Sequence, residues 1–193
     1  MSIICTDRNK LEKFMIDRLK PSRYKHSLGV EKMASKLAEC YGADIEKASF
    51  AGRYHDIAKC LDDETANRLI REYGLPESLL YNNPLAHSKI ASKILSREFG
   101  VVDEDVLNAV AYHTTGRYGM SLLEEIVYVS DAIEENRSYP ELPRLQEQAT
   151  TDLDGACLFI MDYTIDQIKL KNKPIDSDTI EARDFIASRI HKD

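Results

Sequence analysis

The chain has 193 residues, of which 43% are hydrophobic and 31% are charged, a balance that favours one folded domain with a substantial core over a disordered chain. Its formal net charge is -7, so a broad nucleic-acid-binding surface is not expected. No run of about 18 apolar residues suggests a membrane span, and the charged start does not resemble a secretory signal, so we expect a cytoplasmic protein.

The apolar residues recur at helical spacing along almost the whole chain, and no alternating strand pattern interrupts them. In chain order, helices are expected over 7–20, 22–41, a segment from 45 into His55, 64–73, Pro84 to the stop at Gly100, 103–113, 122–135, 144–172 and 178–190. Ser121 and Glu124 have the form of a capping box before 122–135. We therefore expect an all-α, single-domain helical bundle over 1–193, with a core of about 22–135 on which C-terminal helices over 144–191 pack.

Six imidazole and carboxyl side chains fall on helical faces that otherwise have the composition of a core. They are His26, His55, Asp56, His87, His113 and Asp131. Each could be an ordinary hydrogen-bonded core residue, but burying all six without a common partner would be costly. A metal cluster is the simplest common partner, and because the six lie on five expected helices, only a bundle can bring them together.

Nitrogen and oxygen donors of this kind suit Fe, Mn, Co, Ni or Zn. Two ions about 3.5 to 4 Å apart could hold a water between them and lower its pKa toward neutrality. The cysteines, Cys5, Cys40, Cys60 and Cys157, form no CxxC pair, so we expect reduced, mostly buried thiols with structural roles.

The ordered set His26, His55-Asp56 and Asp131 resembles the H...HD...D signature of the HD-domain metal-dependent phosphohydrolase superfamily, and His87 and His113 resemble the additional ligands of its two-metal branch. The chain is most similar to the YqeK family of HD hydrolases. The segments that carry this similarity are Arg23–Ser27, His55–Lys59, His113–Gly116 and Tyr128–Glu134, with Arg137 and Pro140. Where that family often has Ala and Pro, this chain has Ser130 and Glu135, and neither is a ligand position.

The resemblance implies a di-iron centre and a symmetrical cleavage of diadenosine tetraphosphate into two ADP. It also implies how the ligands divide between the two ions. Asp56 would bridge both ions, with His26, His55 and Asp131 on one ion and His87 and His113 on the other.

Basic and hydroxyl side chains near these ligands are candidates for binding phosphate. Lys59 follows Asp56 by nearly one helical turn and could neutralise the departing phosphate, so Asp56 and Lys59 are the catalytic candidates. Arg23 and Arg137 could clamp phosphate oxygens, and Thr114 could donate a hydrogen bond. Each could equally be an ordinary solvated or helix-end residue, and Arg53, Arg117 and Tyr118 are weaker candidates of the same kind.

The sequence thus favours a metal-dependent hydrolase of a small nucleotide, without a nucleic-acid or membrane partner and with the question of a homodimer open. An HD phosphodiesterase or nucleotidase acting on other nucleotides is an alternative that shares the metal core. A metal-containing nucleotide sensor without turnover is a second, and a di-iron oxygenase is a more distant third.

Overall fold

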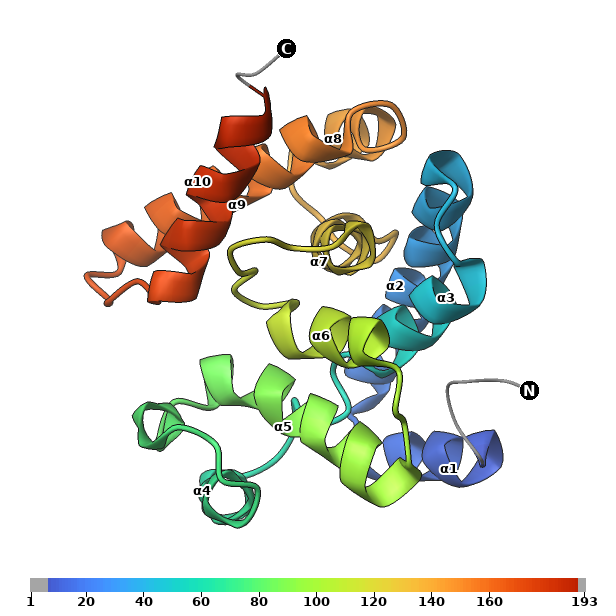
Figure 1. Cartoon of the computed structure of the whole chain (residues 1–193), viewed down its shortest axis with the longest axis vertical. Coiled ribbons are helices and arrows are strands. Elements are labelled where there is room, and N and C mark those ends of the chain that lie inside the picture. Colours follow the sequence, from blue (N-terminus) through green and yellow to red (C-terminus); the bar gives the residue numbers. More distant parts are fainter. Residues whose placement is uncertain (1–6, 191–193) are drawn as a thin grey trace.

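The structure is a computed structural model that describes residues 7–190, and within this range every regular element is a helix (Figure 1). The all-α class expected from the sequence is confirmed. The elements are α1 (Arg8–Arg18), α2 (Pro21–Tyr41), α3 (Ile45–Tyr54), α4 (Asp63–Glu72), the 3-10 turn η1 (Glu77–Leu79), α5 (Asn83–Phe99), α6 (Glu104–Tyr112), α7 (Leu122–Ile133), α8 (Leu142–Gln148), α9 (Leu153–Leu170) and α10 (Ser177–Ile190).

Helix α7 is the centre of the molecule. In Figure 1 it is seen nearly end-on, with α2 and α3 on one side, α9 on the other and α6 below it. It begins at Ser121, whose side chain and that of Glu124 form the expected capping box. Its sequence is apolar on nearly all sides, and a helix of that composition is stable only when neighbours surround it.

One cluster of buried apolar side chains runs through the described part of the chain, from Leu11 in α1 to Ile186 in α10. The C-terminal helices join it because α10 packs on α9 and α9 packs on α7. Burial of each large apolar side chain contributes about 1.5 to 3 kcal/mol, so the C-terminal helices and the earlier helices stabilise each other through this common core.

The segment over 144–172, expected to be one helix, is two. Helix α8 ends at Gln148 and α9 begins at Leu153, because the Asp152 side chain accepts a hydrogen bond from the Gly155 amide at 2.9 Å and caps the new helix. Apolar residues continue at helical spacing across the break, so the sequence pattern does not indicate it. The Tyr41 hydroxyl donates to the carbonyl of Ala149 at 2.8 Å and so ties this turn to the end of α2.

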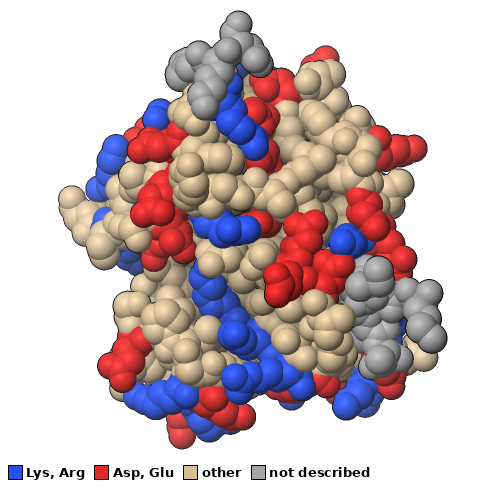
Figure 2. Space-filling view, in the orientation of Figure 1, with Lys and Arg blue, Asp and Glu red and all other residues tan. Residues whose placement is uncertain are grey.

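The expectation of mostly buried cysteines is wrong. Of the described cysteines, all of which are free thiols, Cys157 is buried, Cys60 is half-buried and Cys40 is exposed near the end of α2. Cys5 lies outside the described residues. No described helix is long and apolar enough to span a membrane. On the face drawn in Figure 2, acidic side chains form several separate groups, and basic side chains form a band over the lower half of the view.

Candidate metal centre

The six predicted ligands meet at one place, beside α7. His26 is supplied by α2, His87 by α5 and Asp131 by α7. The others follow directly after helices: His55 and Asp56 come after α3, and His113 comes after α6. The four imidazoles and Asp56 are each at most 6% exposed. The bundle therefore brings together donors from five segments that are far apart along the chain.

The carboxylate of Asp56 lies between two sets of imidazoles. Its Oδ1 atom is 3.2 Å from Nε2 of His87 and 3.5 Å from Nε2 of His113. Its Oδ2 atom is 3.4 Å from Nε2 of His55 and 3.9 Å from Nε2 of His26. Each oxygen of this one carboxylate thus faces a different pair of histidines, which is the geometry that a bridging ligand requires.

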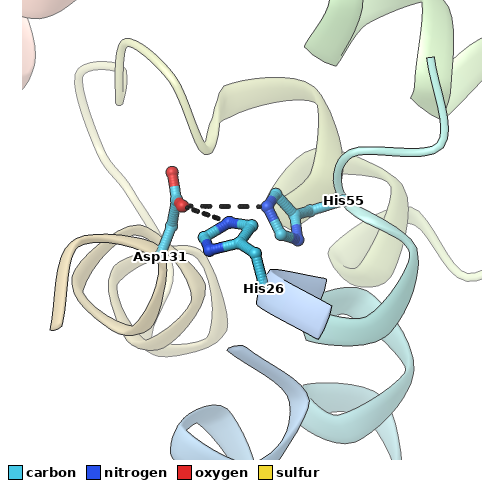
Figure 3. Close-up of side chains that lie close together, drawn as sticks. All are labelled: His26, His55 and Asp131. Carbon is cyan, nitrogen blue, oxygen red and sulfur yellow. Dashed lines mark ion pairs between the residues drawn. The ribbon is translucent and has the colours of Figure 1, made fainter. Parts of the chain in front are cut away.

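Asp131 closes the set on the side of His26 and His55, as Figure 3 shows. Its Oδ1 atom is 2.9 Å from Nε2 of His26 and 3.8 Å from Nε2 of His55. These three side chains form one group in which the possible ligand atoms all lie within 4.8 Å of one another, and His55, Asp56 and His113 form another. Two overlapping groups of three are therefore available to cations.

Three of the imidazoles are held by their Nδ1 atoms, which donate to backbone carbonyls because a carbonyl can only accept. The pairs are His55 to Gly52 at 2.7 Å, His87 to Asn83 at 3.2 Å and His113 to Val110 at 2.8 Å. In a neutral ring held this way, Nε2 carries a lone pair, the form that binds a metal.

The lone pairs of these rings point at one another, which fits a cation between them. Nε2 of His87 and Nε2 of His113 are 3.1 Å apart, and with both protons on Nδ1 neither atom can donate to the other. Nε2 of His26, Nε2 of His55 and Oδ1 of Asp56 are buried, and although each lies within ion-pair distance of a neighbouring group, none makes a hydrogen bond of good geometry. Leaving such atoms unsatisfied costs about 1 to 3 kcal/mol each, and a metal ion would relieve that cost.

The protonation states also suit metal binding. Burial lowers the pKa of His113 to about 4, so this ring is neutral at neutral pH. Burial raises the pKa of Asp56, but attraction to His55 and contacts with the other imidazoles outweigh it and hold that pKa well below its ordinary value. Burial lowers the pKa of His55, but the same attraction to Asp56 outweighs it and raises that pKa, so a metal ion bound at Nε2 of His55 would displace a proton from that atom. For Asp131, burial is likewise outweighed by its contact with His26. The two carboxyl groups are therefore charged and can act as anionic ligands.

The remaining imidazole, His26, is held by a carboxyl group that the sequence reasoning did not place in the site. Glu134 follows α7, is 1% exposed, and its Oε1 atom is 3.1 Å from Nδ1 of His26. Its Oε2 atom accepts from the amide nitrogen and from Nδ2 of Asn136, both at 2.7 Å. The available signal was its position three residues after Asp131, which places it near the same side of the chain.

Gly29 makes room for that carboxyl group. It lies on α2 almost one turn after His26, and a Cβ atom there would be 2.0 Å from Oε2 of Glu134. A side chain at position 29 would therefore displace Glu134 from His26.

The four predicted substrate-binding residues all lie at the cluster. Nη1 of Arg23 donates to Oδ2 of Asp56 at 2.9 Å, and Nη2 of Arg137 donates to Oδ1 of Asp131 at 2.6 Å. Lys59 is close to two ligands: its Nζ atom is 3.1 Å from Nε2 of His87 and 4.0 Å from Oδ1 of Asp56. The Thr114 hydroxyl is 3.3 Å from the same His87 nitrogen.

Two of the weaker candidates, Arg53 and Arg117, do not contact the cluster. Arg53 pairs with Glu12 at 2.7 Å and with Glu31 at 2.5 Å, while Arg117 pairs with buried Glu124 at 2.6 Å. Arg53 therefore joins α3 to α1 and α2, whereas Arg117 joins the turn before α7 to the start of that helix. Tyr118, the third weaker candidate, contacts the ring of Phe185 in α10. A cavity of about 550 Å³ opens from the cluster, where Lys59, His113, Thr114, Asp131 and Arg137 are among its lining residues.

Comparison with known proteins agrees with this geometry. The family model of the HD domain matches residues 23–136, a range that contains all six clustered donors and Glu134. A domain of this class depends on divalent metal ions. The class of protein that the fold and the site define is therefore a metal-dependent HD-domain protein.

Similar proteins narrow the assignment. The chain is 41% identical over 175 residues to a protein of Halalkalibacterium halodurans named symmetrical bis(5'-nucleosyl)-tetraphosphatase, covering 90% of this chain and 94% of that one. A Bacillus subtilis protein of the same name is 40% identical over 172 residues, with 89% and 92% covered. A Clostridium acetobutylicum crystal structure, described as a predicted HD superfamily hydrolase involved in NAD metabolism, has a TM-score of 0.90 at 38% identity, with 96% and 99% covered.

The chain therefore belongs to the HD-domain family and, within it, to the family of symmetrical bis(5'-nucleosyl)-tetraphosphatases. The resemblance found in the sequence is confirmed.

Proposed function

We propose that this protein is a metal-dependent hydrolase that cuts dinucleoside tetraphosphates at the central anhydride and converts diadenosine tetraphosphate into two ADP. The observation that carries the proposal is the convergence of six nitrogen and oxygen donors, some of them buried without a hydrogen bond, beside a cavity whose lining includes Lys59 and Arg137. The two relatives named symmetrical bis(5'-nucleosyl)-tetraphosphatase match nearly the whole chain.

We assign His26, His55 and Asp131 to one ion, His87 and His113 to a second, and Asp56 to both. The distances from the two oxygens of Asp56 to the two pairs of histidines support this division. Iron is our first choice, with Mn, Co, Ni or Zn as the others, because the donors are nitrogen and oxygen. Two such ions would polarise a phosphoryl oxygen and lower the pKa of the attacking water.

The protein's own groups would bind and orient the polyphosphate. Arg23 and Arg137 reach the cluster from two sides, so their guanidinium groups could hold the phosphates on either side of the attacked phosphorus. Lys59 would neutralise the charge that develops on the departing phosphate, and Thr114 would donate a hydrogen bond beside it. All three cationic side chains are between 29% and 36% exposed, so an arriving anion can reach them.

The same proposal includes a small nucleotide as the partner, a cytoplasmic location and a single domain. The continuous core from Leu11 to Ile186 supports the single domain. A homodimer stays open.

The test combines elemental analysis of the purified protein with chromatography of the products formed from diadenosine tetraphosphate. Two ADP support the proposal, whereas AMP plus ATP contradict symmetrical cleavage. Preferred turnover of cyclic or deoxynucleotides indicates the phosphodiesterase or nucleotidase alternative. Affinity without product indicates a sensor, and oxygen consumption indicates an oxygenase.

A pair of variants isolates the metal site. Asp56→Ala should lose metal and activity together while circular dichroism shows the same helix content. Asp166→Ala is the matched control, because the Asp166 side chain lies on α9 and is 71% exposed. Retained metal and turnover in Asp56→Ala would exclude the bridging role.

A further inference from the structure

Two cavities meet at the metal cluster, and they differ in chemical character. The first, of about 550 Å³, leads from the cluster toward α8 and α9. The second, of about 460 Å³, lies beside Arg23 and His26. Asn136 and Arg137 line both cavities and separate them. A substrate that spans the cluster would therefore have one half in each cavity.

The first cavity has an aromatic and apolar wall beyond the cluster. Phe159 and Tyr163 are one turn apart on α9 and both line it. Tyr139 adds a third ring, held in place because its hydroxyl donates to the carbonyl of Ala132 at 2.9 Å. Tyr163 is 51% exposed, so its ring is not committed to the core. Flat rings of this kind offer stacking surfaces to a nucleobase.

The second cavity has no such wall. Its seven lining residues are all polar or charged: Ser22, Arg23, Lys25, His26, Glu134, Asn136 and Arg137. The one carboxyl group among them is engaged with His26 and Asn136. Arg23 and Arg137 each pair with one carboxylate of the cluster and keep guanidinium N–H groups for an anion, and Lys25 is exposed. This lining suits phosphate oxygens and provides no stacking surface for a base.

From this asymmetry we propose that the enzyme recognises only one nucleoside of its substrate. The base of one half stacks in the cavity lined by Tyr139, Phe159 and Tyr163, and the other half is held through its phosphates beside Arg23 and Lys25. This inference rests on the proposed function. It goes further, because it makes the second nucleoside dispensable.

Adenosine 5'-tetraphosphate should then be a substrate that is cut in its middle. Water adds to a phosphorus atom of the central anhydride, the bond between the second and third phosphates breaks, and a proton is released. The products are ADP and pyrophosphate. Because stacking tolerates any base, mixed dinucleoside tetraphosphates should react as well.

The turnover experiment compares diadenosine tetraphosphate, adenosine 5'-tetraphosphate and inorganic tetraphosphate on metal-loaded enzyme. We expect the first two to have kcat/KM values within about tenfold of each other, because both offer one base for stacking. Inorganic tetraphosphate should have a KM higher by about tenfold or more, the loss of one stacked base. Turnover of the first compound without the second would overturn the inference while leaving the proposed function intact.

A binding experiment tests the aromatic cavity without turnover. Calorimetry with ADP and with pyrophosphate is run on the metal-loaded parent, Tyr163→Ala, Tyr163→Phe and Tyr118→Ala. Tyr163→Ala should weaken ADP by about tenfold and leave pyrophosphate unchanged, and Tyr163→Phe should restore ADP affinity because it keeps the ring. Tyr118 is the matched control, since it is 68% exposed and its ring meets that of Phe185 edge to face, outside the cavity.

These readouts separate the two proposals. Absence of any diadenosine tetraphosphate hydrolysis would refute the proposed function, and a selective loss of ADP affinity in Tyr163→Ala would still support the nucleoside cavity. Equal ADP affinity in Tyr163→Ala and the parent would refute the cavity whatever the turnover results.

Discussion

A single methyl group added at Gly29 should disturb the metal centre. In most helix interiors, Gly→Ala stabilises a protein by about 0.5 to 1 kcal/mol. At position 29 the new Cβ atom would lie 2.0 Å from Oε2 of Glu134 and 2.9 Å from Nδ2 of Asn136. Glu134 has no space to retreat, because it is 1% exposed and both of its oxygens have partners.

The size of the effect follows from two costs and one opposing gain. Overpacking costs about 1 to 3 kcal/mol, and a displaced carboxyl group that loses its buried partners costs a similar amount. Set against the helix-propensity gain of at most about 1 kcal/mol, the expected result is a net loss of about 3 kcal/mol in the free energy of unfolding. His26 also loses the contact that orients its ring, so metal affinity should fall by about 10- to 100-fold.

Urea unfolding of the metal-free protein measures the first quantity, and metal titration measures the second. Gly155→Ala is the control, because its Cβ atom would also lie 2.0 Å from a carboxylate, that of Asp152, but this side chain is exposed and can turn away. Gly155→Ala should keep full metal affinity. Combining Gly29→Ala with Glu134→Ala should cost less than the sum of the two single changes, since the clash is gone.

A Gly29→Ala protein that is as stable as the parent and binds metal equally well would refute the reasoning.

Three other perturbations test separate parts of the structure. Removing metal with a chelator should lower the free energy of unfolding by about 2.7 kcal/mol, relative to the protein with metal at 100 times its Kd. Thermal unfolding with and without the chelator measures this difference, and the Asp56→Ala protein should show none. Burial, opposed by Arg189, raises the pKa of Glu125 to about 7. The folded state therefore holds one more proton than the unfolded state between about pH 4.5 and 7. The free energy of unfolding should fall as pH rises through that range, by about 3 kcal/mol at most. Glu125→Gln should flatten that slope in urea unfolding at pH 5 and pH 8, and an unchanged slope would contradict the assignment. Arg137→Lys keeps the charge but loses the planar guanidinium group that contacts both the side chain and the carbonyl of Asp131. The kcat/KM value should therefore fall about tenfold. Equal kcat/KM values in the variant and the parent would show that Arg137 does not bind substrate.

Local pattern was sufficient to place most helices and to select the six imidazole and carboxyl side chains that converge. Apolar residues at helical spacing mark the buried face of each helix, and a histidine or aspartate on that face must point inward. The capping box of Ser121 and Glu124 was equally visible, because both partners lie within one turn. The break between α8 and α9 was not, since the apolar period continues across it and the Asp152 cap appears as one more polar residue.

Features that join distant segments were decided only by the tertiary structure. Glu134 meets His26 across 108 positions of the chain, and Gly29 matters only because that carboxyl group lies against it. Arg53 and Arg137 look alike in the sequence, yet one pairs with carboxylates between helices and the other reaches the cluster. The sequence by itself determined which side chains face inward, because that depends on neighbours within a few residues. Which inward and surface groups meet depends on how whole helices pack, so only the folded chain decides it.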